Sequence, residues 1–381
     1  MFEKQIQMVD LHGQYVRLKD EIDVAMQSVI DSCAFINGPQ VKTFAAHLGE
    51  YLDIPYVIPC GNGTDALQIA LMALELQPGD EVLIPAFTYV AAAEVVALLG
   101  ITPVLVDVDL NTFNINPEKI EEALSPKTKA IIAVHLFGQS CDMASIMKIA
   151  EVHHLYVIED NAQSIGASYT FPNGRIKKAG TIGHIGTTSF FPSKPLACYG
   201  DGGALMTEDK GLAERIHMIA NHGQKQKYYH KLIGCNSRLD TLQAAILDVK
   251  LKHLDEFTKA RQLVSSQYDV ALSATEGILT PVKSEFSTHV YHQYTIQVKD
   301  GYRDALQSFL KEKGIPSMVY YPLPLQSQEA YQKIMHAGGT LDVSERLSKC
   351  VLSLPIHTEM TENEQQYIIE TLIGAILKIA R

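Results

Sequence analysis

The spacing of hydrophobic positions changes from helical to strand-like and back along most of the chain. In the first fifty residues, helical spacing of apolar side chains predicts two helices, over 14–33 and 41–52, with the turn Asn37-Gly38-Pro39 between them. Short apolar runs then predict strands at 56–59, 81–85, 103–108, 130–135 and 156–159, and helices at 90–99, 117–124 and 143–152. This alternation predicts βαβ units and a mostly parallel sheet covered on both faces, so the fold class is α/β.

The pattern changes in the last quarter of the chain. Before it, helical spacing predicts helices at 212–219, 241–254 and 258–272. After about residue 275, strands are predicted at 290–298 and 317–321, and helices at 303–313, 344–352 and 362–377. We therefore expect a large domain over 1–274, which starts with an N-terminal helical segment, and a small α+β domain over 275–381.

Composition and charge exclude several classes of partner. Hydrophobic residues make up 46% of the 381 positions and charged residues 20%, which is typical of a globular enzyme with a large core. The net charge of −11 argues against nucleic acid as the main partner, because phosphate backbones require a basic surface. Anionic small molecules need only a local basic patch, so they stay possible.

Targeting and metal signals are missing from the sequence pattern. The stretch Met1–Gln5 has no apolar signal-peptide core, and the apolar run 90–106 is interrupted by Glu94, Gly100 and Pro103. The six cysteines are scattered without a C-x-x-C pair or metal-ligand spacing. We expect a cytoplasmic protein with no membrane span and no metal site.

Lys194 lies in an apolar, aromatic stretch, Ser189-Phe190-Phe191-Pro192-Ser193, which is followed later by Gly200-Asp201-Gly202-Gly203. Lysine is rarely buried without a partner, and apolar surroundings lower its pKa. A lysine of this kind is a nucleophilic amine that forms Schiff bases with carbonyl groups. The alternative is a solvated lysine at the tip of a loop after a strand.

A glycine-rich turn, Cys60-Gly61-Asn62-Gly63, leads into an amphipathic helix. Such a turn exposes backbone N–H groups, and the helix N-terminus adds a partial positive charge, so a phosphate group could bind there. Thr64 or Asp65 can cap this helix. An ordinary capped helix without a ligand is the alternative.

Polar side chains follow three of the predicted strands: Thr88 and Tyr89 after one, His135 at another, Asp160 and Gln163 at a third. In parallel sheets ligands bind beyond the carboxyl ends of the strands. Asp160 could hold a protonated heterocyclic nitrogen by a charge-assisted hydrogen bond, or it could cap the next helix. Tyr89 could stack on a flat ring or pack in the core. A phosphate cradle, an aromatic plate, a strand-end carboxylate and a buried amine together fit pyridoxal phosphate, with the carboxylate keeping the ring nitrogen protonated.

The stretch 224–231 is basic and aromatic within an acidic protein, with three lysines, two tyrosines and a histidine. It is the best candidate for binding an anionic substrate. A solvated loop is the alternative reading.

Ordered motifs make the chain resemble, nearly from end to end, the sugar aminotransferases of the DegT/DnrJ/EryC1/StrS group. The motifs are Gly61–Leu67, Pro85–Ala91, Val134–Gln139, Ile158–Gln163, Ser189–Lys194 with Gly200–Gly203, and Asn236–Asp240. The resemblance implies a pyridoxal-phosphate enzyme of fold type I, with a three-layer large domain like that of aspartate aminotransferase.

The resemblance also implies residue roles. Lys194 would hold the cofactor as a Schiff base and transfer the proton, Asp160 would pair with the ring nitrogen, and Gln163 would bind the ring hydroxyl. Tyr89 would stack on the ring. The implied phosphate ligands are Gly63, Thr64 and Ser189 and, from the neighbouring subunit of a homodimer with shared active sites, Asn236. The implied substrate contacts are Arg238 of that neighbouring subunit, Tyr320 and Tyr321.

The implied reaction transfers an amino group from L-glutamate, which leaves as 2-oxoglutarate, to a keto sugar on a nucleotide diphosphate. The motif around Lys194 looks closest to enzymes that aminate UDP-2-acetamido-2-deoxy-3-oxo-glucuronate. Those enzymes usually have His-Tyr-Pro where this chain has Tyr320-Tyr321-Pro322, so a dTDP-linked 3-oxo-6-deoxyhexose is the main alternative.

Relatives that dehydrate sugars have histidine in place of the lysine, so Lys194 argues against dehydration. A regulatory protein that has lost turnover is a further alternative, whereas no G-x-G-x-x-G follows an early strand to suggest a dehydrogenase.

Overall fold

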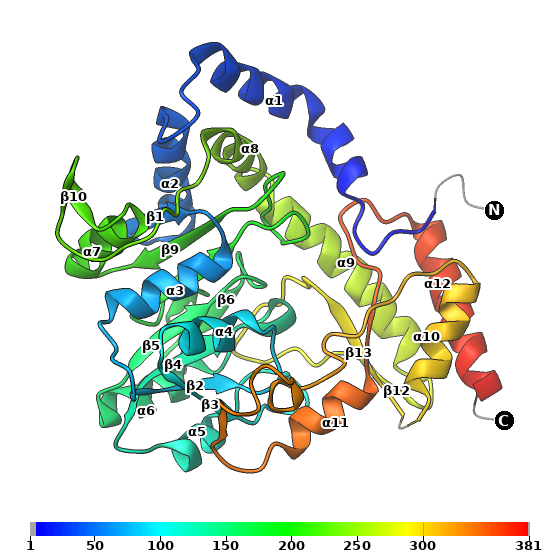
Figure 1. Ribbon diagram of the computed structural model, residues 1–381. Helices are drawn as coiled ribbons and strands as arrows, with labels where there is room; N and C mark the ends of the chain where they lie inside the picture. Colours follow the sequence, from blue (N-terminus) through cyan, green and yellow to red (C-terminus); the bar gives the residue numbers. More distant parts are fainter. Residues whose placement is uncertain (1–4, 300, 380–381) are drawn as a thin grey trace.

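A computed structural model describes residues 5–299 and 301–379, so part of the stretch Met1–Gln5 lies outside the described residues. The centre of the fold is an eight-stranded sheet (Figure 1). In spatial order its strands are β1 (Tyr56–Cys60), β9 (Gly203–Thr207), β8 (Ile185–Ser189), β5 (Tyr156–Asp160), β4 (Thr128–Val134), β2 (Glu81–Pro85), β3 (Thr102–Val106) and β14 (His336–Ala337). All neighbouring pairs are parallel except those that β9 makes with β8 and β1. The predicted α/β fold with a mostly parallel sheet is confirmed.

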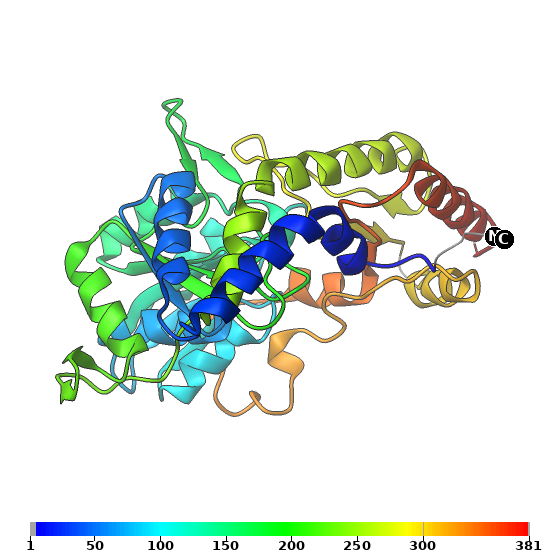
Figure 2. The same cartoon turned by 90° about the horizontal axis from the view of Figure 1, so that it is seen from above.

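Helices cover both faces of this sheet and make it the middle of three layers (Figure 2). One face packs on α3 (Gly63–Ala73), α4 (Ala91–Leu98) and α7 (Lys210–Ala220). The other packs on α5 (Pro117–Ala123), α6 (Met143–His153), α2 (Pro39–Leu52) and α8 (Thr241–Leu251). The long helix α1 (Leu11–Ser32) lies on α8.

Alternating side chains of each central strand enter different cores. In β2, Val82 and Ile84 pack in the core with α3 and α4, whereas Leu83 packs in the core with α5 and α6. A strand that is buried on both faces needs apolar residues at every position, which is why these strands are short continuous apolar runs in the sequence.

A second sheet lies at the other end of the molecule from the hairpin β10 (Gln224–Gln226) and β11 (Tyr229–His230) (Figures 1 and 2). It is antiparallel and contains β12 (Ile278–Leu279), β13 (Tyr294–Val298) and β15 (Val351–Leu354). Its core includes side chains of α9 (Leu254–Leu272), α10 (Arg303–Glu312) and α12 (Glu362–Ile379), and also Ile6. A small hairpin, β6 (Ser168–Thr170) with β7 (Ile176–Lys178), completes the sheets.

The chain returns from the second sheet to the first. After Tyr321 it crosses to the edge of the large sheet, where β14 pairs in parallel with β3. The following helix, α11 (Asp342–Cys350), is held at its start by Asp107, whose carboxylate accepts hydrogen bonds from the backbone N–H groups of Val343 and Ser344, each at 2.9 Å. The predicted division at residues 274 and 275 therefore stays a prediction, because segments after 321 pack in both cores.

Most predicted elements match the structure to within a few residues at each end, and three after residue 275 need correction. The predicted strand 317–321 is wrong: only Met318 forms a bridge, with Ser353, and the chain then turns so that Tyr320 and Tyr321 reach a cavity. The predicted strand 290–298 begins only at Tyr294, because the four preceding residues leave the sheet. The predicted helix 344–352 ends at Cys350, after which β15 begins.

Two further findings complete the fold. The antiparallel strand β9 was not predicted by the apolar pattern. Over residues 5–299 and 301–379, no helix has both the length and the apolar character needed to cross a bilayer.

Candidate functional site

A cavity of about 600 Å³ lies at the carboxyl ends of the parallel strands. Nine of the predicted site residues line it: Gly63, Thr64, Tyr89, Asp160, Gln163, Ser189, Lys194, Tyr320 and Tyr321. Two predicted residues, Asn236 and Arg238, do not line this cavity. The sheet topology explains the convergence, because parallel strands present their carboxyl ends at one edge.

Lys194 lies in the loop after β8, where its backbone N–H donates to the carbonyl of Phe191 at 2.8 Å. Burial lowers the pKa of its amine to about 8, although the nearby Asp160 carboxylate works in the opposite direction. A larger fraction of this amine than of an ordinary lysine is therefore unprotonated near neutral pH and can act as a nucleophile.

Asp160 ends β5 and faces the same cavity. One of its oxygens accepts a hydrogen bond from the backbone N–H of Ala162 at 3.1 Å. Burial raises the pKa of this carboxyl, and the hydrogen bond from Ala162 and the charge of Lys194 partly oppose that shift. A protonated ring nitrogen placed here would restore the ionised form through a charge-assisted hydrogen bond.

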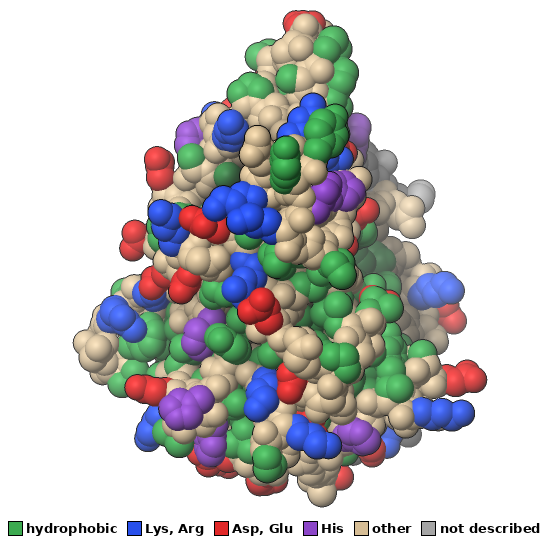
Figure 3. All heavy atoms as spheres, turned by 60° about the vertical axis from the view of Figure 1, so that its left-hand side comes forward, with side chains coloured by type: hydrophobic (Ala, Val, Ile, Leu, Met, Phe, Trp, Pro, Cys, Tyr) green, Lys and Arg blue, Asp and Glu red, His purple; other side chains and the backbone are tan. Residues whose placement is uncertain are grey.

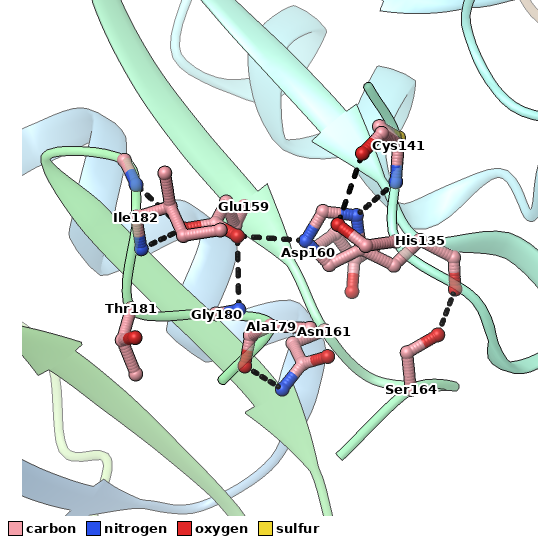
Figure 4. A network of polar contacts seen from close by, with 12 residues as sticks. His135, Cys141, Glu159, Asp160, Asn161, Ser164, Ala179, Gly180, Thr181 and Ile182 are labelled. Atoms are coloured by element: carbon pink, nitrogen blue, oxygen red, sulfur yellow. Dashed lines mark hydrogen bonds and ion pairs between the residues drawn. The ribbon is translucent and has the colours of Figure 1, made fainter. Parts of the chain in front are cut away.

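Glu159, the residue before Asp160 in β5, connects the end of this strand to neighbouring segments by hydrogen bonds (Figure 4). Its carboxylate accepts hydrogen bonds from Nε2 of His135 at 2.8 Å and from the backbone N–H groups of Gly180, Ile182 and Gly183 at 2.9, 2.6 and 2.6 Å. Burial alone would raise the pKa of Glu159, but these donors lower it below its usual value.

His135 connects this network to the loop after β5. Its Nδ1 accepts from the backbone N–H of Cys141 at 3.1 Å, so the proton of the neutral ring lies on Nε2 and points to Glu159. Its carbonyl accepts from the hydroxyl of Ser164 at 2.7 Å, and its N–H donates to the carbonyl of Asp160. The network therefore fixes the loop that carries Gln163.

The turn before α3 forms a cradle at a helix N-terminus. Asn62 caps the helix, because its side chain accepts from the N–H of Asp65 at 2.7 Å. A side chain at position 63 would fill the cradle, since a Cβ there would lie 2.6 Å from the Cβ of Ser189. Free N–H groups of the first turn and the positive end of the helix dipole favour a phosphate group in this place.

An aromatic wall closes the other side of the cavity. The ring of Tyr321 lies 5.9 Å from that of Phe87 and 6.3 Å from that of Tyr89, measured between centroids. Tyr89 is 59% exposed, so its ring is available to a ligand. Gln163 binds this wall, since its amide nitrogen donates to the Tyr321 hydroxyl at 3.4 Å and its oxygen accepts from the N–H of Phe137 at 2.8 Å.

Sequence reasoning missed His292 and Gln293, which also line the cavity. His292 is buried, and burial, followed by the charges of Lys194 and Arg261, holds its pKa well below the usual value, so the ring is neutral. The two adjacent polar residues within the run predicted as a strand were the available signal, because a buried strand rarely carries such a pair. Thr88 and Asp201 are further lining residues without a predicted role.

The segment with Asn236 and Arg238 lies behind the cradle. Ser237, between them, has its hydroxyl oxygen 2.9 Å from the N–H of Gly61 and 2.6 Å from a carboxylate oxygen of Asp65. Asn236 is exposed and pairs by a single bridge with Asn221. Within the described residues there is no cluster of three or more side chains that could bind a metal ion.

Comparison with known proteins agrees with this geometry. Residues 16–373 match the DegT/DnrJ/EryC1/StrS aminotransferase family. The chain is 47% identical over 369 residues to a "Pleiotropic regulatory protein" of Geobacillus stearothermophilus, covering 96% of this chain and 97% of the relative. It is 46% identical over 352 residues to the UDP-2-acetamido-2-deoxy-3-oxo-D-glucuronate aminotransferase of Pseudomonas aeruginosa, covering 92% and 95%.

A similar solved structure contains a bound form of the cofactor. The fold matches that of NtdA from Bacillus subtilis with bound PMP with a TM-score of 0.90 and 33% identity, covering 99% of this chain and 86% of that one. The cradle, the half-buried Lys194 amine and the strand-end carboxylate fit pyridoxal phosphate, the cofactor of the family. The predicted fold type I is confirmed by the structural neighbours. The chain belongs to the DegT/DnrJ/EryC1/StrS aminotransferase family and is a pyridoxal-phosphate-dependent sugar aminotransferase.

Proposed function

We propose that this protein transfers an amino group from L-glutamate to a keto sugar carried on a nucleotide diphosphate, with 2-oxoglutarate as the other product. The observation that carries the proposal is the meeting of the Lys194 amine and the Asp160 carboxylate in one cavity with the cradle at Gly63. When bound, pyridoxal phosphate supplies an electron sink for the carbon that loses or gains a proton.

The residues of the chain divide the work. Lys194 binds the cofactor and, once displaced, takes and returns the proton as general base and acid. Asp160 keeps the ring nitrogen protonated, Gln163 contacts the ring hydroxyl, and Tyr89 stacks on the ring. The backbone N–H groups of Gly63 and Thr64, together with Ser189, hold the phosphate.

We propose carbon 3 of UDP-2-acetamido-2-deoxy-3-oxo-glucuronate as the acceptor position, in amino-sugar synthesis for a cytoplasmic step of surface polysaccharide production. The Pseudomonas relative supports this choice by name. Tyr320 in the cavity, where such enzymes usually have histidine, favours a dTDP-linked 3-oxo-6-deoxyhexose as the second candidate, and transaminases of that class are also similar to this chain. A regulatory protein without turnover is the third candidate.

We also propose a homodimer in which Asn236 and Arg238 enter the neighbouring site. Both residues lie outside the cavity of their own chain. Exposed apolar side chains lie at the end of α1 and just after it: Ile30 in its last turn, then Phe35 and Ile36. Figure 3 shows hydrophobic side chains on the narrow upper part of the molecule, at the height of α1 in Figure 1. Exposed apolar patches of this kind mark interaction surfaces.

The basic hairpin β10–β11 supports an anionic substrate. Tyr228 and Tyr229 are 78% and 67% exposed, and the hairpin carries Lys225, Lys227 and Lys231 away from the body of the chain (Figure 1). Among the residues lining the cavity Lys194 is the single lysine or arginine, so charge for a diphosphate must come from elsewhere. We propose that the hairpin supplies it.

The test is an absorbance spectrum of the purified protein before and after addition of L-glutamate. The band of the bound cofactor should bleach with glutamate and return with the correct keto sugar nucleotide alone. Offering the UDP-linked and the dTDP-linked sugar separately names the substrate. A protein that stays colourless with added pyridoxal phosphate contradicts the proposed function, and bleaching without recovery with any sugar contradicts the acceptor class.

A further inference from the structure

The loop that carries Lys194 is held by one side chain of α8. Gln243 uses its amide oxygen to accept the backbone N–H of Tyr199 at 2.8 Å and its amide nitrogen to donate to the carbonyl of the same residue at 3.3 Å. Tyr199 is five positions from Lys194 and belongs to no helix or strand. Without Gln243, both backbone groups would lose their protein partner.

Other contacts make this loop a closed unit. The N–H groups of Phe190 and Cys198 donate to the carbonyls of Gly202 and Phe190 at 2.7 and 2.9 Å, which join its beginning, middle and end. Leu196 and Cys198 are buried in the same core cluster as α8. A shift of Tyr199 would therefore move the whole loop, including Lys194, relative to the sheet.

The same region of the chain also holds the phosphate cradle. Ser237, six positions before Gln243, accepts the N–H of Gly61 at 2.9 Å and donates to the carboxylate of Asp65 at 2.6 Å. Gly61 and Asp65 lie on either side of Gly63, so the Ser237 hydroxyl joins both ends of the cradle. Between Ser237 and Gln243, Leu239 is 1% exposed and packs with Phe190 and Leu196, so the segment is fixed in the core.

We propose that Ser237 and Gln243 are positioning residues that set the place of the phosphate cradle relative to the Lys194 amine. The segment 237–243 is the short rigid connection between the two places where the cofactor is held, one through its phosphate and one through its carbonyl carbon. This inference rests on the proposed use of the cradle and of Lys194 for pyridoxal phosphate. It adds that the phosphate cradle and Lys194 are not correctly spaced without the segment 237–243. A cofactor of fixed length must contact both at once.

Two probes distinguish binding at the phosphate cradle from binding at Lys194. Pyridoxal phosphate uses the cradle, Lys194 and the residues around its ring, whereas pyridoxal lacks the phosphate and depends on Lys194 and the residues around the ring without the cradle. We expect Ser237→Ala to weaken equilibrium binding of pyridoxal phosphate about ten-fold, the scale of one or two hydrogen bonds, and to leave pyridoxal binding unchanged. We expect Gln243→Leu to weaken binding of both probes and to shift the pH midpoint of the absorbance band of bound pyridoxal.

Further variants keep the result decisive. Gln243→Glu retains the acceptor for the Tyr199 N–H and should recover part of the lost pyridoxal binding, and it stands in for the Leu variant if that protein does not fold. Gln366→Leu replaces an exposed glutamine of α12 and should leave both probes unaffected. The double variant Ser237→Ala/Gln243→Leu should lose less affinity for pyridoxal phosphate than the product of the two single losses, because the connection is already broken in each.

The outcomes distinguish this inference from the proposed function. If the wild-type protein binds pyridoxal phosphate and both variants bind the two probes as the wild type does, the positioning role is wrong and the function stands. Equal loss of both probes in Ser237→Ala, or strictly multiplicative losses in the double variant, also contradict it. If the wild type binds neither probe, the proposed function itself fails.

Discussion

At the scale of single residues, burial moves two opposite charges toward neutrality in the same cavity. The pKa of Lys194 falls to about 8, and that of Asp160 rises above its ordinary value. Each group loses hydration, and the attraction between them restores only part of the loss. The cavity is therefore prepared for a ligand that needs a free amine on one side and a carboxylate acceptor on the other.

The pH dependence of cofactor uptake tests the state of Lys194. Only the unprotonated amine attacks the carbonyl, so the rate of reaction with pyridoxal phosphate should rise with pH and level off above about pH 8. Rapid-mixing absorbance measurements on the apo-protein at a series of pH values give the midpoint. The same reaction of Nα-acetyl-lysine corrects for titration of the cofactor itself. If the protein's midpoint lies near that of Nα-acetyl-lysine, the lowered pKa of Lys194 is contradicted.

Lys194→Ala should abolish the covalent attachment and reduce turnover by at least the ~10²–10⁴-fold typical of a lost acid–base group. Pyridoxal phosphate should still bind through the cradle and Asp160. Borohydride should not attach it covalently to the protein, because no Schiff base is present. Mass spectrometry after borohydride treatment makes the comparison with the wild type. Normal turnover in this variant would exclude Lys194 as the amine that holds the cofactor.

At the scale of elements, the ends of β4 and β5 are held together because the side chains of Glu159 and His135, behind the cavity, are fully hydrogen-bonded. Glu159 points away from Asp160, as successive strand residues do, and receives four hydrogen bonds. Buried groups of this kind stabilise only as a complete set, since a missing partner leaves several donors unpaired. The strand end that presents Asp160 depends on this set.

Glu159→Gln should lower the free energy of unfolding by about 3 kcal/mol near neutral pH, because the amide cannot accept from all four donors. The lowered pKa of Glu159 means that its contribution is complete above the ordinary value of 4.5 and is lost as the pH falls through the folded value. Urea unfolding of both proteins should therefore converge in acid. Glu208→Gln, an exposed partner of Lys177, is the control and should cost less than about 1 kcal/mol, and an equal cost for both variants would contradict the buried network.

Gly63→Ala tests the cradle as an element. The added Cβ would lie 2.6 Å from that of Ser189, so the phosphate should lose its place and the dissociation constant of pyridoxal phosphate should rise roughly ten-fold or more. Equilibrium titration followed by absorbance measures it. Gly374→Ala, in α12 with nothing within 4 Å, is the matched control and should leave cofactor binding unchanged. If Gly63→Ala and Gly374→Ala bind pyridoxal phosphate with equal affinity, the cradle does not bind the cofactor phosphate.

The sequence predicted the parts of the site that local patterns encode. Lys194, Asp160 and the turn at Gly63 each follow a recognisable strand or precede a helix, and the parallel sheet then brings them to one edge. His292 could not be placed, because its position depends on where β13 begins, and hydrogen bonds from distant residues such as Arg261 and Gln262 hold that preceding segment. The strand β9 was missed because its apolar pattern continues a glycine turn, and only its pairing with β8 and β1 defines it.

At the scale of the whole molecule, the second sheet and the large sheet contribute to one cavity. His292 and Tyr321 come from segments next to the second sheet, whereas Asp160 and Lys194 come from the large one. With Asn236 and Arg238 of the partner chain added, the proposed site would be built from two chains. Relative placement of these parts is then a property of the assembly rather than of any element.

Mixed dimers test the shared site. Lys194→Ala and Arg238→Ala homodimers should each be strongly impaired, but equal mixing after dissociation should recover about a quarter of wild-type activity, because half of the dimers would contain one intact site in a two-fold assembly. The assay is glutamate-dependent amination of whichever keto sugar nucleotide restores the absorbance band. If Arg238 serves its own chain, no mixture contains an intact site and activity stays low.

The two-residue strand β14 has a consequence for attempts to divide the protein. It covers the β3 edge of the large sheet, which would otherwise expose unpaired N–H and C=O groups, and Gly338 adds a further bond to Leu105 at 2.8 Å. A fragment that stops at residue 274 would lack this cover, together with the apolar side chains of Leu325, Leu341 and Leu347 that fill the large core. Uncovered strand edges template association with other chains. Recombinant production of 1–274 alone should therefore yield aggregates, which co-expression with the remaining residues relieves.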